Sequence, residues 1–196
     1  NTAKFSDYTT FQADSAIACK APEADIQKFK AQETRNDMLF DQSVFQNEPK
    51  GKLTVYSVIT PNYYSYTESA TPINWNLSEE TNTVCGYTCQ KAVGEYGGRT
   101  WTVWYSSEIP VSFGPWKLCG LPGLVLAAND AENIHQFKAI TFRKSNTPMN
   151  LKPYTNTINI SREQFIKAKN KFEIDPMGNI PGEAISEMSV QKFDNG

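Results

Sequence analysis

The side chains that could carry chemistry gather in one stretch, residues 84–126. Cys89 is a candidate nucleophile, because Lys91 follows two residues later on the same strand face and a nearby cation lowers the pKa of a thiol. The alternative is an inert buried or disulfide-bonded cysteine. Glu108 is a candidate general acid or base, but no partner carboxylate at fixed spacing supports that role. We therefore expect no catalytic residue here, and a thiol-dependent enzyme using Cys89 stays open as an alternative.

The single histidine, His135, would have to serve any Ser–His or Cys–His site. It lies in an acidic, turn-like run, which favours an exposed loop histidine. A structural zinc site needs several cysteine or histidine ligands at set spacings, and Cys85-x3-Cys89 with one distant histidine matches this poorly. We expect no metal and no cofactor.

Gly97-Gly98 between two strand-like runs predicts a two-residue β-hairpin, because such turns need positive φ at their central positions. A two-residue turn fixes the register, so that Lys91 faces Trp104 and Tyr87 faces Glu108. The first pair predicts a cation–π contact or a lysine whose stem covers the ring. The second predicts a hydrogen-bonded pair or two separate surface residues.

Period-two alternation divides the hairpin residues between two faces. One face is predicted to join the core and carries Val84, Gly86, Ala92, Trp101, Val103 and Tyr105. The chemically richer face carries Cys85, Tyr87, Cys89, Lys91, Trp104 and Glu108. On this prediction Cys85 and Cys89 lie roughly 13 Å apart along one strand and cannot bond to each other.

The composition limits the class of protein. A chain of 196 residues favours a single domain, 1–196, with a real core. The formal net charge of −2 gives no field for nucleic acid or an anionic membrane, and no apolar run reaches the ~20 residues of a membrane span. Asn1 in place of methionine, without a signal peptide, indicates a mature or trimmed chain. Four cysteines permit two disulfides in three connectivities, so all are candidates: Cys19, Cys85, Cys89 and Cys119.

Local patterns predict a mainly β to α+β domain, an open twisted antiparallel sheet with one or two helices packed on it. Pro22 followed by acidic residues predicts one helix start, and the capping box at Ser161-Arg162-Glu163-Gln164 predicts another. Outside the hairpin, strands are predicted at 53–59, 63–67, 75–77, 116–119, 124–128 and 136–142. The run Gly120-Leu121-Pro122-Gly123 predicts a tight turn between strands, or alternatively a rigid lip that holds Trp116 and Leu121 toward a ligand.

The most specific motifs of the chain lie between residues 36 and 142: Asn47-Glu48-Pro49-Lys50-Gly51-Lys52, Gly86-Tyr87-Thr88-Cys89-Gln90-Lys91-Ala92, Gly98-Arg99-Thr100-Trp101, Glu108-Ile109-Pro110, Gly114-Pro115-Trp116-Lys117 and Gly120-Leu121-Pro122-Gly123-Leu124-Val125. With these motifs the sequence resembles the GLPGLI family of secreted or cell-envelope proteins of Bacteroidetes. The resemblance implies export to the periplasm, cell surface or medium, and no established activity. It is also similar to envelope domains whose half-barrel sheet shelters something apolar, a likeness of fold alone.

Two departures from that family are informative. Cys85 and Cys119 occupy positions that are usually apolar, so the resemblance implies a Cys85–Cys119 disulfide that leaves Cys19 and Cys89. The family also has more strand sequence before the segment that matches residues 4–8. The resemblance therefore implies a domain that lacks N-terminal strands, or one whose sheet another segment completes, with an exposed edge in either case.

Our functional hypothesis is an exported, non-enzymatic protein that binds an apolar ligand or an envelope protein in a groove beside the hairpin 84–107. The residues expected to form this site are Tyr87, Lys91, Trp104, Glu108, Trp116 and Leu121. A third possibility is a structural or assembly component of an envelope complex.

Overall fold

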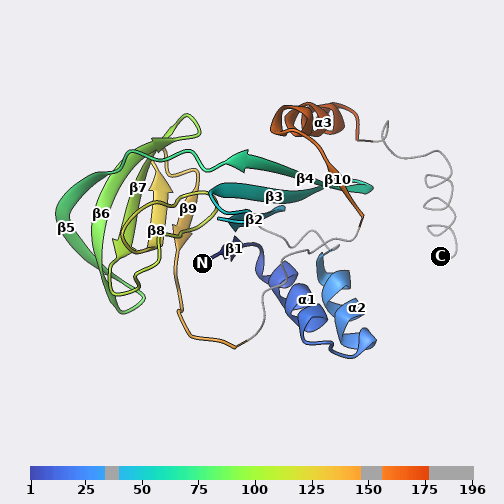
Figure 1. Ribbon diagram of the computed structural model, residues 1–196, viewed down its shortest axis with the longest axis horizontal. Coiled ribbons are helices and arrows are strands. Elements are labelled where there is room, and N and C mark those ends of the chain that lie inside the picture. The colour runs from blue at the N-terminus through green and yellow to red at the C-terminus, as the bar shows by residue number, and fades with distance from the viewer. Residues whose placement is uncertain (34–39, 147–155, 177–196) are drawn as a thin grey trace, which may run out of the picture.

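The computed structural model describes residues 1–33, 40–146 and 156–176. These residues form two five-stranded sheets and three helices (Figure 1). The expected class, mainly β to α+β with open, antiparallel-rich sheet and packed helices, is confirmed. The strands are divided between two sheets, whereas the sequence predicted one.

The first sheet has the strand order β1-β2-β3-β4-β10. Its strands are β1 (Ala3–Phe5), β2 (Gln42–Gln46), β3 (Lys52–Ile59), β4 (Asn62–Ser69) and β10 (Thr157–Asn159). All neighbours pair antiparallel except β10, which lies parallel to β4 at one edge. This edge strand comes from a part of the chain that is about 90 residues away in sequence from β4, so sequence periodicity alone does not reveal the pairing.

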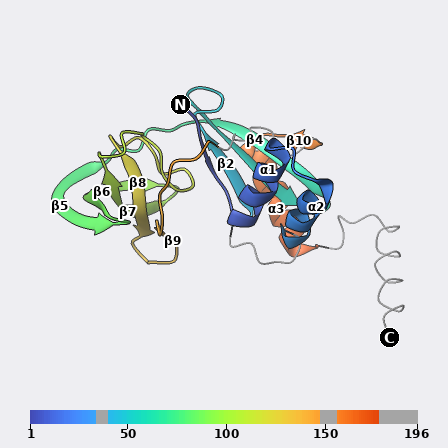
Figure 2. The same cartoon turned by 90° about the horizontal axis from the view of Figure 1, so that it is seen from below.

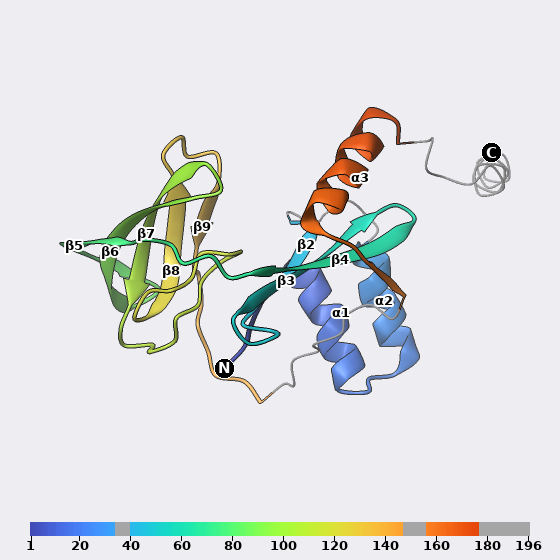
Figure 3. The same cartoon turned by 45° about the horizontal axis from the view of Figure 1, so that its top comes forward.

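Helices cover both faces of this first sheet (Figure 3). Helices α1 (Tyr8–Ala18) and α2 (Glu23–Glu33) lie together on one side, and α3 (Arg162–Ile174) lies on the other. The predicted capping box opens α3, because the Ser161 hydroxyl accepts from the backbone of Gln164 and the Gln164 amide accepts from the backbone of Ser161. Phe165 on the first turn is buried against Tyr66 of β4, with ring centroids 5.2 Å apart.

The second sheet has the order β5-β6-β7-β8-β9 and is antiparallel throughout. Its strands are β5 (Asn76–Val84), β6 (Tyr87–Tyr96), β7 (Arg99–Ser106), β8 (Leu124–Asp130) and β9 (Gln136–Lys138). The predicted β6–β7 hairpin is confirmed: Gly97 and Gly98 have φ of 61° and 75°, and Lys91 pairs with Trp104.

Just before this hairpin, the structure has a second tight turn that the sequence analysis did not predict. Cys85 and Gly86 have φ of 51° and 82° and join β5 to β6, so Cys85 and Cys89 do not share a strand. Val84 therefore belongs to β5 and packs beside Cys89, on the face opposite to the one predicted. The predicted core members of the hairpin proper are confirmed in one buried cluster: Ala92, Trp101, Val103 and Tyr105.

Some local predictions were wrong in extent or type. Helix α1 and strands β1, β2 and β10 were not predicted, and the third predicted strand extends to Val84 as β5. Residues 116–119 are not a strand, because Trp116 has a φ of 53° and lies in the loop 107–123. Strand β9 ends at Lys138, so it covers only the first three residues of the strand predicted over 136–142.

The two sheets lie side by side (Figure 2). The loop 107–123, which connects β7 to β8, packs against the first sheet. Gln46 on β2, only 1% exposed, donates to the carbonyls of Gly114 (2.9 Å) and Trp116 (2.7 Å). The buried Lys117 pairs with Glu68 of β4. That residues 1–196 form a single folding domain stays a prediction.

Candidate functional site

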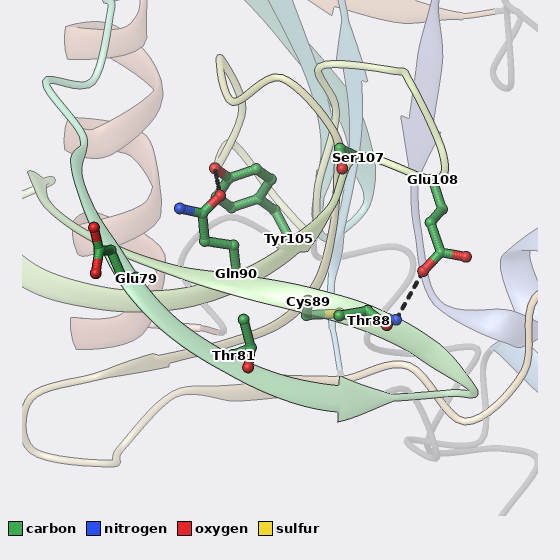
Figure 4. Close-up of a pocket in the computed structure, with 8 residues that line it drawn as sticks. All are labelled: Glu79, Thr81, Thr88, Cys89, Gln90, Tyr105, Ser107 and Glu108. Atoms are coloured by element: carbon green, nitrogen blue, oxygen red, sulfur yellow. Dashed lines mark hydrogen bonds between the residues drawn. The ribbon is translucent and has the colours of Figure 1, made fainter.

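A pocket of ≈ 460 Å³ lies beside the two hairpins of the second sheet (Figure 4). This volume is within the range of about 300–1,000 Å³ that is typical of ligand sites. The lining comes from β5, β6, β7 and the residues that follow β7: Glu79, Thr81, Thr88, Cys89, Gln90, Tyr105, Ser107 and Glu108. Hydroxyl, amide and carboxylate groups therefore line the pocket together with a similar amount of apolar surface.

An irregularity in β5 helps to shape the pocket. The pairing of β5 with β6 shifts between Leu77 and Thr81, so the residues between them leave the regular ladder. Gln90 fills part of the gap, because its side chain donates to the carbonyl of Ser78 at 2.8 Å and accepts from the Tyr105 hydroxyl at 2.7 Å. These two hydrogen bonds hold Gln90 and Tyr105 in place as a fixed floor.

The pocket wall carries negative charge. Glu108 is exposed, and one of its carboxylate oxygens accepts from the backbone N–H of Thr88 at 3.0 Å. Within the described part of the chain, neither Glu108 nor Glu79 forms an ion pair, and no basic residue lines the pocket. The neighbouring Lys91 is bound to Glu80 at 2.8 Å.

The thiol of Cys89 is poorly placed as a nucleophile. Its residue is 0% exposed, and its Sγ contacts the carbonyl of Tyr87 at 3.5 Å. Burial raises the pKa of the Cys89 thiol, and the charge of Glu108 raises it further. Lys91 does not offset this effect, because its ammonium group is occupied by Glu80. The thiolate that nucleophilic catalysis requires is disfavoured.

The predicted site residues on the chemically richer face of the hairpin have separate partners. Trp104 and Tyr87 are half-buried in a small apolar cluster with Cys89, and Tyr87 meets Phe142 at a ring distance of 5.7 Å. Glu108 binds the backbone of Thr88 and not the Tyr87 hydroxyl. Among the described residues, the cation–π contacts involve other lysines than Lys91.

Trp116 and Leu121 lie on the opposite face of the sheet. Leu121 is 2% exposed inside the cluster around Trp101, and Trp116 packs edge-on against Tyr96 at 5.6 Å. Of the six predicted residues, only Glu108 lines the pocket. Binding by the other five stays a prediction.

The predicted disulfides are wrong, since all four cysteines are free thiols. The Cys119 carbonyl accepts from the indole of Trp75, which immediately precedes β5, whereas Cys85 follows the far end of β5. A nine-residue strand separates these points by roughly 25 Å, well beyond the reach of a disulfide.

His135 is half-exposed beside a buried carboxylate. Its Nδ1 lies 3.0 Å from Asp130, which is 0% exposed and also receives a hydrogen bond from Arg99 at 2.9 Å. Burial raises the pKa of Asp130, but hydrogen bonds from His135 and Ile134 and the charge of Arg99 outweigh it and leave the pKa below its usual value. Within the residues described, no group of three or more potential ligands could hold a metal ion.

Sequence reasoning missed most of the pocket. Gln90 was assigned to neither face of the predicted hairpin, and the predicted strand 75–77 stopped before Glu79 and Thr81. The useful signal was the pair Cys85-Gly86, since a glycine at the second position is typical of a tight hairpin turn. That turn would have placed β5 beside β6.

The architecture defines a class of protein: a two-sheet α+β domain whose polar pocket lies at the hairpins of one sheet. The family described as "N-glycanase peptide, N-terminal domain" matches residues 12–162, and the chain belongs to this family. A search of curated proteins finds no match.

Two solved structures share the fold. "Structure of PNGF-II in P21 space group" superposes with a TM-score of 0.58 at 18% identity, covering 71% of this chain and 26% of that one. "Structure of PNGF-II in C2 space group" gives 0.57 and 19% with the same coverage. The chain thus spans about a quarter of the length of these neighbours.

The expected membership of the GLPGLI family is wrong, because the family match and the structural neighbours both point to the N-glycanase N-terminal domain. The motif that suggested it has a structural role here. Gly123 lies against β7, where an added Cβ would meet the Ser106 carbonyl at 2.2 Å. None of the described helices is long and apolar enough to cross a membrane.

Proposed function

We propose that the chain is a non-catalytic accessory domain that docks onto a polypeptide through the pocket beside the β5–β6–β7 hairpins. The observation that carries this proposal is the pocket itself, a recess lined by two carboxylates and several hydroxyl groups, whose one thiol is buried and has a raised pKa. Membership of a family of N-terminal domains of N-glycanases supports an accessory role.

The carboxylate and hydroxyl groups of the lining favour a polypeptide over the apolar ligand that the sequence suggested. An apolar occupant would take the lining carboxylate and hydroxyl groups out of water without giving them hydrogen-bond partners. A polypeptide supplies both backbone and side-chain partners. The relevant polypeptide is a glycoprotein or a further part of an N-glycanase.

We also propose that the domain acts outside the cytoplasm. N-linked glycans are carried on surface loops of secreted proteins, so an N-glycanase-related domain would meet them there. Cell fractionation tests this proposal, and recovery of the protein only from the cytoplasm would contradict it.

The docking proposal is tested with one N-glycosylated protein, used unfolded before and after removal of its glycans. We expect the chain to bind both forms in calorimetry and to release no glycan by itself. Thr81→Trp on β5 fills the pocket and should weaken binding about tenfold, which is ~1.4 kcal/mol.

Asn82→Trp is the matched control, because Asn82 is exposed on the same strand and its side chain alternates to the other face. It should leave binding unchanged. Glycan release that disappears in Cys89→Ala would instead establish the thiol enzyme. Binding that is indifferent to Thr81→Trp would place the docking surface elsewhere.

A further inference from the structure

The pocket combines negative charge with unfilled acceptor capacity. Thr88 N–H fixes one oxygen of Glu108, and the second oxygen has no protein partner in the described part of the chain. Figure 4 shows Glu79 and Glu108 at opposite ends of the recess, with hydroxyl groups between them. Carboxylates are acceptors only, so they need a donor from the occupant.

The charges that could neutralise this recess are engaged elsewhere. Lys91 is the basic residue adjacent to the lining, and its ammonium group lies 2.8 Å from Glu80. Arg99, at the other end of β7, is bound to the buried Asp130. The negative potential in the pocket is also reflected in Cys89, whose pKa is raised further by the charge of Glu108.

An open sheet edge runs beside the pocket. Strand β5 pairs with β6 and is the outermost strand of its sheet, and it contributes Glu79 and Thr81 to the lining. Nearly all of its residues are exposed. An edge strand offers unpaired backbone N–H and C=O groups to an extended peptide, and an adjacent pocket then selects one side chain of that peptide.

We propose that the pocket is a receptor for one basic side chain, arginine or lysine, of an extended polypeptide that lies along the β5 edge. The proposal rests on the proposed docking function and names the chemistry of the docked segment. A guanidinium or ammonium group would donate to the second oxygen of Glu108, and the charge of Glu79 at the other end of the recess would add attraction. The hydroxyl oxygens of Thr88 and Ser107 supply further acceptors.

The shape of the site favours arginine over lysine. Ser107 and Thr88 lie beside Glu108, and a planar guanidinium presents several donors in divergent directions that suit the Glu108 carboxylate together with these hydroxyl oxygens. An ammonium group is a compact charge without this planar fork of donors.

The test uses capped, extended peptides of threonine and valine with one central residue, measured by fluorescence anisotropy with the full chain. The central residue is arginine, its neutral isostere citrulline, lysine or glutamate. We expect the arginine peptide to bind about tenfold more tightly than the citrulline peptide, and the advantage to shrink as salt rises above about 0.1 M. The glutamate peptide should bind most weakly.

Variants locate the effect. Glu108→Gln keeps an oxygen for the Thr88 N–H, so it should fold normally while losing most of the preference for arginine over citrulline. Glu79→Gln should lose part of it. Glu173→Gln removes one exposed carboxylate from α3 and should leave the preference intact.

The possible results separate the two proposals. Equal binding of the arginine and citrulline peptides, reduced by Thr81→Trp, overturns the basic-residue inference and keeps the docking function. A preference for arginine that survives Glu108→Gln and Glu79→Gln overturns the assignment to this pocket. Failure of every peptide to bind, with binding of a neutral oligosaccharide instead, overturns both.

Discussion

The buried aspartate behind His135 shows how a single residue can hold together one end of the second sheet. Asp130 ends β8 and accepts hydrogen bonds from the backbone N–H groups of Ile134 and His135 and from the side chain of Arg99. A buried carboxylate is tolerated when donors of this kind surround it. Its depressed pKa means that the folded state favours the ionised form.

Asp130→Asn should destabilise the protein at neutral pH, with a loss that shrinks in acid. Because the pKa of Asp130 is lower in the folded than in the unfolded protein, its ionisation stabilises the fold at pH values above the unfolded pKa of about 3.9. This stabilisation is lost as the pH falls through the folded pKa. The measurement is the urea midpoint of both proteins between neutral pH and about pH 3. The two midpoints should converge at the acidic end.

Glu132→Gln is the control for this experiment. Glu132 is an exposed partner of the same Arg99 at 3.5 Å, so its replacement should shift the midpoint little at any pH. If Asp130→Asn lowered the urea midpoint by the same amount at every pH, ionisation of Asp130 would not contribute to the stability of the fold.

At the scale of elements, the hairpins and helix caps follow from local chemistry. Gly97-Gly98 adopts the positive φ that its position requires, and the pairing of Lys91 with Trp104 follows from that turn. The Ser161 capping box was equally readable, because both partners are adjacent in sequence. Such signals involve only neighbours, so the sequence contains them in full.

Ser161→Ala should cost about 1 kcal/mol of stability, since it leaves the N–H of Gln164 without its capping acceptor. Ser161→Thr retains the hydroxyl and should recover most of the loss. Chemical unfolding followed by far-UV circular dichroism measures both variants. Equal destabilisation by alanine and threonine would show that the cap contributes little.

Other elements depend on partners distant in sequence and could not be predicted. Strand β10 consists of three residues that gain their conformation only by pairing with β4. Helix α1 buries small and polar residues, among them Thr10, Ala13 and Asp14, so it lacks an apolar stripe. The pocket was missed for the same reason, because it needs β5 beside β6 and the Gln90 side chain turned toward Tyr105.

At the scale of the whole molecule, the loop 107–123 connects the two cores. Trp116 packs against the clusters of both sheets, and Phe5 of the first sheet meets Phe137 of the second at a ring distance of 5.6 Å. Gln46 supplies the polar part of the joint, with two donated hydrogen bonds to the loop carbonyls. These contacts predict that the sheets unfold together.

Two probes can follow the sheets separately. All four tryptophans, residues 75, 101, 104 and 116, belong to the second sheet and its loops, whereas the helices pack on the first. In the unmodified chain, tryptophan fluorescence and helical circular dichroism should report the same urea midpoint. Gln46→Ala should lower the free energy of unfolding by about 2–4 kcal/mol, because buried carbonyls lose their donor and a cavity forms.

Gln27→Ala provides the control, since Gln27 is exposed on α2 and its side chain donates to Glu23 of the same helix. The free energy of unfolding of this variant should stay within about 0.5 kcal/mol of the parent value. Different midpoints for the two probes in the unmodified chain would show two independent domains.

The acidic outer strand has one more consequence, for contacts between copies of the protein. Two molecules that approach with their β5 edges would bring Glu79 and Glu80 of each into register with like charges, and the irregular pairing at these residues would misalign the backbone groups. Fibril-like stacking through this strand is thereby discouraged at neutral pH. Glu79, which would attract a basic guest to the pocket, would thus also disfavour polymerisation of the protein through its own edge.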